Sequence, residues 1–193
     1  MLTSFQNDLK PFAELAQSFT SKELAGKVAE YDRYPCGNSF HAVVEKAYQT
    51  GFLGIMLPPA LGGSGGGIGE LCVVLYHICQ SDASLGGIIF THTLARELLI
   101  TAKSDEIAAA LFLKASSARD ALVAFPAYSD PLHVRDLPEA APAGEGYCLS
   151  GKIDMLVLGD LAAQAIMPAR TRTGSSYSLF LVHLADTGLT KSD

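Results

Sequence analysis

A cluster of glycines has a spacing that could form a ligand-binding loop. The stretch LPPALGGSGGG, residues 57–67, has five glycines among its last six residues. Such a loop can bind phosphate through its backbone amides. A dinucleotide loop needs Gly-x-Gly-x-x-Gly, and the third glycine is replaced by Ile68 when the motif starts at Gly63 and by Glu70 when it starts at Gly65. A mononucleotide loop ends in Gly-Lys-Ser/Thr, and no lysine occurs here. We therefore expect a tight connector that lets two helices approach closely.

Side chains that could act as nucleophile, base or metal ligand show no catalytic spacing. The serines between residues 64 and 84 lack a Gly-x-Ser-x-Gly turn with a partner histidine, and the five histidines lack metal-ligand spacing. His92 lies in an apolar helical stretch, where it is either a core histidine or a residue that lines a cleft. Glu70, Glu97 and Glu106 fall at predicted surface or helix-start positions. We therefore predict no catalytic residue and no metal site.

Cysteine use and charge limit the class of protein. Four cysteines occur without Cys-x-x-Cys spacing, and Cys72 and Cys79 lie two helical turns apart, where we expect them to pack in the core. Few cysteines and the absence of a basic-then-apolar N-terminal segment predict a cytoplasmic protein. The net charge of −6 without a polybasic run argues against nucleic acid as a partner. A membrane is also not expected, because no apolar stretch is long enough to span one.

The pattern of apolar residues, which predicts the helices and strands, changes near residue 120. Before it, apolar residues recur at three- and four-residue steps, which predicts five helices: 4–30 with a break or late start at Pro11, 39–50, 68–79, 82–99 and 105–117. After it, short runs predict strands: 121–125, two strands around an SGK turn within 146–159, AAQAIMPAR and SYSLFLVHL. The stretch from residue 126 to AAPAGEG is predicted to be a loop. Helices followed by strands indicate an α+β fold.

The run GFLGIMLPPALGGSG, followed one helix later by QSDASLGG, resembles the N-terminal helical domain of the acyl-CoA dehydrogenases. In that family, Gly-Leu-x-Gly-Ile-x-x-Pro-x-x-x-Gly-Gly-x-Gly joins two helices. The stretch AELAQSFTSKELAGKVAEYDR is similar to the family's opening helix, and GYCLSGKIDMLVLGDLAAQAIMPARTRTG and SLFLVHLADTGL are similar to parts of its β-domain. The resemblance covers nearly the whole chain. It implies an N-terminal all-α domain over 1–119, followed by a small, truncated antiparallel β-domain over 120–193.

The resemblance implies flavin-dependent α,β-dehydrogenation of an acyl-CoA thioester. A base takes the α-proton while FAD accepts the β-hydrogen as hydride, and the protein supplies orientation and hydrogen bonds to the thioester carbonyl. FAD and acyl-CoA are therefore the expected ligands. Because the helix with His92 lies near the acyl cavity in this family, His92 and Ser129 are the candidates for substrate binding.

The positions that correspond to the family's flavin contacts differ in polarity. Where the family has Thr-Glu-Pro-x-Ala-Gly-Ser-Asp, this chain has AFPAYSD, so Ala124 replaces a threonine that hydrogen-bonds the flavin and Phe125 replaces a glutamate. In the second motif, Met155 replaces the aromatic residue that packs on the flavin ring, and Val157 replaces a Thr or Ser. Loss of a hydroxyl removes a polar contact outright. The predicted cofactor-binding positions are Ala124, Phe125, Ser129, Met155 and Val157.

Measured against the family, the chain stops at Asp193, about midway through the β-domain, so the helical domain that carries the catalytic glutamate is expected to be absent. We predict a subunit that takes part in FAD-linked dehydrogenation of acyl-CoA within a larger assembly. FAD would bind only if a protein partner supplies the missing half. Self-association is the other arrangement, and a non-catalytic scaffold subunit or pseudo-enzyme without flavin is the alternative function. A composition of 49% hydrophobic and 18% charged residues favours an apolar face that a partner covers.

Overall fold

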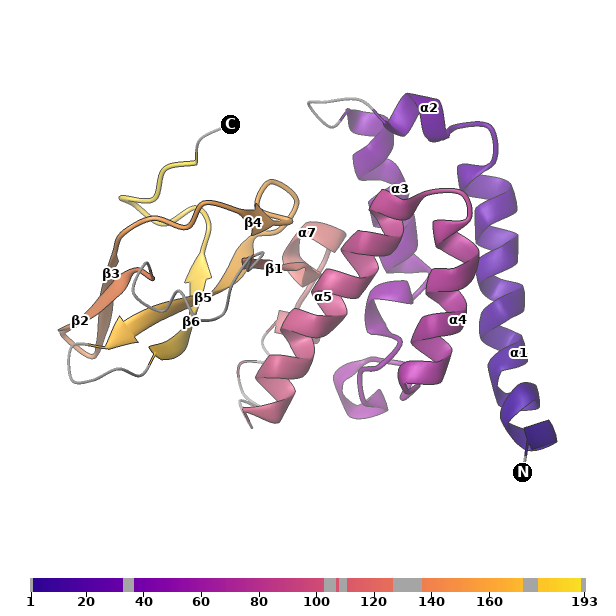
Figure 1. Cartoon of the computed structure of the whole chain (residues 1–193), viewed down its shortest axis with the longest axis horizontal. Coiled ribbons are helices and arrows are strands. Elements are labelled where there is room, and N and C mark those ends of the chain that lie inside the picture. The colour runs from indigo at the N-terminus through magenta and orange to yellow at the C-terminus, as the bar shows by residue number, and fades with distance from the viewer. Residues whose placement is uncertain are drawn as a thin grey trace. The chain divides into compact units, whose positions relative to one another are not determined.

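The computed structural model describes residues 2–32, 37–102, 107, 111–126, 137–171 and 177–191, with side chains from Asp8 onward. The chain forms two compact units, residues 1–121 and residues 122–193. The first unit is helical, and the second contains a sheet with six strands among its described residues (Figure 1). The α+β fold class is thereby confirmed. Across the described ranges, none of the helices combines the length and apolarity that a membrane span requires.

The first unit consists of α-helices with short π and 3₁₀ turns between them. Its elements are α1 Leu2–Phe19, η1 Thr20–Leu24, α2 Val28–Tyr31, α3 Asn38–Gln49, η2 Phe52–Gly54, η3 Pro59–Leu61, α4 Ile68–Cys79, α5 Ala83–Thr101 and α7 Ala118–Ala121. The predicted break at Pro11 is wrong, because α1 continues through this exposed proline. The buried residues Ala16 and Phe19 hold the following turns in the core. The chain leaves the helix later, and Gly26 there has a φ of +75°.

The glycine-rich stretch is a connector that folds back on itself. A Cβ atom on Gly63 would lie 2.1 Å from the Cβ of Leu57, so only glycine fits there. The backbone N–H of Gly65 donates to the Leu57 carbonyl and that of Gly66 to the Ile55 carbonyl, each at 2.8 Å. The N–H of Gly67 then donates to the Glu70 carboxylate, and this hydrogen bond caps the start of α4. The close approach lies inside the loop rather than between two helices.

Helix α4 packs against both α1 and α5 in the first unit. The Asp82 carboxylate caps α5 by accepting a hydrogen bond from the Leu85 N–H at 2.9 Å. The buried residues of α4 are Leu71, Val74 and Ile78. Cys72 and Cys79 are exposed, so the prediction that they pack in the core is wrong. The predicted helix 105–117 ends early, because the chain leaves the helical conformation after Phe112.

The sheet of the second unit has the strands β1 Val123–Pro126, β2 Glu139–Ala143, β3 Gly146–Ser150, β4 Leu156–Val157, β5 Gln164–Thr171 and β6 Tyr177–His183. Their order is β3-β2-β5-β1-β4, and β6 pairs with β5. Most pairs are antiparallel, as predicted, but β1 and β2 both run parallel to β5. The β5–β6 pair joins the two strands predicted at AAQAIMPAR and SYSLFLVHL.

Three details of the sheet differ from the predicted strands. The strand predicted at 121–125 starts at Val123, because Ala121 still belongs to α7. Residues 139–143, predicted as loop, form β2. Pro142 is tolerated there because β2 pairs with β5 only through Glu139 and Ala140. The two strands around the SGK turn do not pair with each other, since β3 pairs with β2 and β4 with β1.

Candidate functional site

The structure brings most of the predicted cofactor positions together on β1 and β4. Phe125 and Val157 are Cα partners in the antiparallel pair of these strands. Paired residues of neighbouring strands point to the same face of a sheet, and successive residues of one strand alternate between faces. Phe125 and Val157 therefore share one face, while Ala124 points to the other. Met155 lies immediately before β4.

Strand β1 has a strand neighbour on each edge, whereas β4 is the last strand in the sheet order. β1 lies between β4 and β5, with Val123 opposite Gln164 and Ala124 opposite Ala165. Ala124 is fully buried.

The turn that ends β4 is unusual, because Leu158 has a φ of +68°, which is uncommon for a residue other than glycine. The Leu158 carbonyl accepts from the Ala162 N–H at 2.9 Å, and the Leu156 carbonyl accepts from the Gly159 N–H at 3.2 Å. The Lys191 ammonium donates to the Gly159 carbonyl at 2.5 Å. These bonds fix the chain directly after Val157.

The β1–β4 pair offers apolar side chains to a ligand. Phe125 and Val157 are half-buried, and Met155 is 66% exposed. These side chains can contact the face of an aromatic ring, and Met does so favourably. None of them carries a donor for the polar edge of an isoalloxazine ring. These three side chains therefore fit the apolar part of a flavin and not its polar edge. Ser129, the remaining predicted position, lies outside the described residues.

His92 lies in the core of the first unit and is 1% exposed. Its Nε2–H donates to the backbone carbonyl of Leu53 at 3.2 Å, which fixes the tautomer of the neutral ring. Burial, with a smaller contribution from the nearby Arg96 charge, lowers the pKa of His92 to about 3. His92 is therefore a neutral, hydrogen-bonded core residue near pH 7. Its assignment to acyl-CoA binding stays a prediction.

Arg96 is a buried charged residue that the sequence patterns did not single out. It lies one turn after His92 on α5, and its Nη1 donates to the same Leu53 carbonyl. Its guanidinium carbon lies 5.4 Å from the centre of the Phe112 ring, a cation–π contact. Its Nε and Nη2 have no hydrogen-bond partner among the residues that the structure describes, and burial lowers the pKa of Arg96 to about 10. The sequence signal that could have identified Arg96 as buried is its position within the apolar run of α5.

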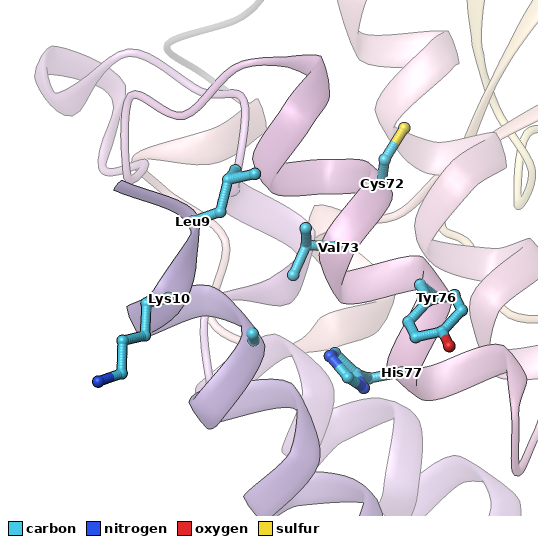
Figure 2. Close-up of a pocket in the computed structure, with 7 residues that line it drawn as sticks. Leu9, Lys10, Cys72, Val73, Tyr76 and His77 are labelled. Carbon is cyan, nitrogen blue, oxygen red and sulfur yellow. The ribbon is translucent and has the colours of Figure 1, made fainter. Parts of the chain in front are cut away.

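A pocket of about 490 Å³ lies between α1 and α4. Figure 2 shows Leu9 and Lys10 on α1 and four labelled residues on α4, and the full lining is Leu9, Lys10, Ala13, Cys72, Val73, Tyr76 and His77. None of the predicted site residues lines this pocket. Lys10 is already paired with Glu14 at 3.7 Å, and His77 contacts Gln17. Within the described residues, no group of three or more His, Cys, Asp or Glu side chains could hold a metal ion.

The comparisons with known proteins that give matches agree with one another. The family model described as acyl-CoA dehydrogenase, N-terminal domain, matches residues 6–117, more than half of the chain. Comparison with curated protein sequences gives no match. Similar solved structures include butyryl-CoA dehydrogenase from Megasphaera elsdenii, with a TM-score of 0.74 and 18% identity over 93% of this chain and 49% of that one.

Two further structures have the same fold. A probable acyl-CoA dehydrogenase from Mycobacterium abscessus has a TM-score of 0.75 and 21% identity over 93% of this chain and 49% of that one. An acyl-CoA dehydrogenase from Bacillus anthracis, solved in complex with FAD, has a TM-score of 0.77 and 18% identity over 96% of this chain and 32% of that one. This chain spans about half the length of the first two structures. At these identities the similarity establishes the fold alone.

Proposed function

The chain belongs to the acyl-CoA dehydrogenase family through its N-terminal domain, and on that premise we propose that it is a subunit of a larger assembly that carries out FAD-linked α,β-dehydrogenation of an acyl-CoA thioester. The pairing of Phe125 with Val157 carries this proposal. By resemblance, the two residues occupy positions of two separate flavin motifs, and the sheet gives them a common face.

The side chains of this chain would form the apolar part of the cofactor site. Phe125, Val157 and Met155 can exclude water from a bound ring and hold its position by contact. Polar donors and the catalytic base would come from a partner chain that supplies the rest of the family fold. We place the assembly in the cytoplasm, in acyl-CoA and fatty acid metabolism.

A second candidate function is a non-catalytic scaffold or binding subunit without flavin. The observation in its favour is the lack of any side-chain hydroxyl, amide or charge at Ala124, Phe125, Met155 and Val157. In this case the apolar face would pack against another protein rather than a cofactor. The two functions differ in one measurable property, which is flavin in the assembled complex.

The deciding experiment is the visible absorption spectrum of the chain purified alone and in complex with chains from its own cell extract. A flavin spectrum in the complex, bleached on addition of acyl-CoA, supports the catalytic subunit. A stable complex that lacks flavin even after incubation with FAD contradicts it and supports the scaffold function. Flavin retained by the chain alone contradicts the requirement for a partner.

A further inference from the structure

Strand β4 has few contacts within the sheet to fix its position. It is two residues long, and among the described strands it pairs with β1 alone. Its two Cα pairs are Val157 with Phe125 and Leu156 with Pro126. Because a proline has no N–H to donate, the second pair forms an incomplete ladder. Most strands are longer than this one. The position of Val157 therefore depends on the chain on either side of β4.

The chain before β4 offers no buried anchor. Residues 141–157 are all described, and none of them is buried. The ion pair of Lys152 with Asp154 joins two largely exposed side chains, and such pairs contribute little to stability. Leu158, immediately after β4, is the next buried residue and is 9% exposed. Its apolar side chain is therefore the nearest anchor for Val157 in the core.

The backbone of this anchor is strained. With its φ of +68°, Leu158 is the one residue other than glycine that has a positive φ among the described residues. The hydrogen bond from the Gly159 N–H to the Leu156 carbonyl makes Leu158 the third residue of a four-residue turn. A positive φ at this position normally selects Gly or Asn. A strained conformation persists only where the surroundings determine it, and here the burial of the leucine side chain does so.

The same residue also fixes the chain that follows. The Leu158 carbonyl accepts from the Leu161 N–H at 3.0 Å and from the Ala162 N–H at 2.9 Å, and Ala162 is fully buried. Rotation about φ of Leu158 turns everything before this residue relative to everything after it. Since the part after it is tied into the core, a change of this φ would move β4. The left-handed conformation of Leu158 therefore sets the direction in which Val157 lies.

We propose that Leu158 is a positioning residue for the candidate cofactor site. Its buried side chain and its left-handed backbone together hold Val157 opposite Phe125, and so keep the face that these two residues share in shape for a ring. Leu158 acts through Val157 and makes no ligand contact of its own. The role of the face in binding FAD rests on the proposed function, whereas the hold of Leu158 on β4 does not.

Leu158→Ile and Leu158→Met test the role of the backbone. Both variants keep an apolar side chain of similar size, but Ile is branched at Cβ and strongly disfavours a positive φ. Amide hydrogen exchange of the full chain, followed by NMR, reports on the N–H groups of Gly159, Leu161 and Ala162, which the turn bonds protect. We expect these amides to exchange at least about tenfold faster in Leu158→Ile and nearly as in the wild type in Leu158→Met.

Two controls show that the effect is local. The Leu184 N–H, which donates to the Ala163 carbonyl beside the β5–β6 pair, should change much less in Leu158→Ile, which also shows that the sheet is folded. Leu184→Ile makes the same change at a residue that is 8% exposed and has no positive φ. It should leave the exchange of Gly159, Leu161 and Ala162 unchanged.

FAD titration of the assembled protein, followed by flavin fluorescence, measures the consequence for the site. The affinity should fall about tenfold in Leu158→Ile and stay near the wild-type value in Leu158→Met and Leu184→Ile. Unchanged exchange in Leu158→Ile overturns the proposal, as does exchange that rises equally throughout the second unit. Faster exchange with unchanged FAD affinity also overturns it, while the proposed function stands. A wild-type assembly that binds no FAD contradicts the proposed function instead, and the exchange data then decide alone whether Leu158 holds β4.

Discussion

Phe125 and Val157 lie directly opposite each other on neighbouring antiparallel strands, although a long segment of chain separates them in sequence. Their side chains share one face of the sheet, and those of Ala124 and Leu156 occupy the other. This relationship gives the predicted cofactor positions two different surroundings. Two of them lie on a partly accessible face, and one is closed off in the core.

Val157→Thr should increase the affinity for FAD in the assembled protein. The substitution conserves shape and adds a hydroxyl on the face shared with Phe125, where one hydrogen bond contributes about 0.5–1.5 kcal/mol, or up to about tenfold in affinity. Quenching of FAD fluorescence on titration with the protein measures this. Leu156→Thr, on the opposite face and equally half-buried, is the matched control and should leave the affinity unchanged. Equal effects of the two substitutions would contradict a ligand on the Phe125–Val157 face.

Ala124→Thr should destabilise the second unit without restoring a flavin contact. Ala124 is fully buried opposite Ala165, so a threonine there adds volume to a packed core and buries a hydroxyl. Such changes typically cost about 1–3 kcal/mol in the free energy of unfolding. Urea unfolding followed by circular dichroism gives the value. An unchanged stability, together with tighter FAD binding, would show that this position faces a ligand.

Gly86→Ala and Gly87→Ala should have opposite effects on the first unit. A Cβ on Gly86 would lie 2.1 Å from the Sγ of Cys79 on α4, whereas a Cβ on Gly87 meets nothing within 4 Å. Gly87→Ala should therefore raise the free energy of unfolding by about 0.5–1 kcal/mol, the usual gain for alanine in a helix. Gly86→Ala should lower it by about 1–3 kcal/mol through overpacking.

The double variant Cys79→Ala with Gly86→Ala tests the cause of that loss. Removing the sulfur should return most of the stability that Gly86→Ala removes, so the two changes should not be additive. Additive effects would locate the strain elsewhere in α5.

Local signals in the sequence predicted where helices and strands lie better than which elements pair with them or cover them. The helical period and the glycines placed α4, and Asp82 marked the start of α5, because both signals act within a few residues. β2 was missed because Pro142 argues against a strand, and only the register shows that this part of β2 has β3 alone as its neighbour. The exposure of Cys72 was missed for a similar reason, since helical spacing defines a face without showing what covers it.

The candidate site shows the same limit. Sequence motifs identified Phe125 and Val157 separately, and only strand pairing shows that they meet. Arg96 carried no motif, and its burial against the Leu53 carbonyl depends on how α5 packs on the preceding loop. Polar groups in the core are determined by tertiary contacts, which no local pattern specifies.

His92 should make the first unit less stable as the pH falls. Its pKa is about 3 in the folded protein and about 6.5 in an unfolded chain, so the folded state favours the neutral ring. The resulting stabilisation is fully present above about pH 6.5. It is lost progressively as the pH falls toward 3, by up to about 1.4 kcal/mol per pH unit, because the unfolded chain takes up a proton that the folded protein does not.

His92→Gln isolates this contribution, because the amide can still donate to the Leu53 carbonyl but does not titrate. Urea unfolding measures the stability difference between wild type and His92→Gln. This difference should shrink between about pH 7 and about pH 4 and then change sign in favour of the variant. The reason is that only the wild type must keep a buried imidazole neutral at a pH where the unfolded chain protonates it. His41→Gln, at an exposed position on α3, is the control for a histidine-to-glutamine change outside the core and should change the stability little. A constant difference between wild type and His92→Gln over that range would mean that His92 can accept a proton without unfolding, and would place it at an accessible cleft instead of in the core.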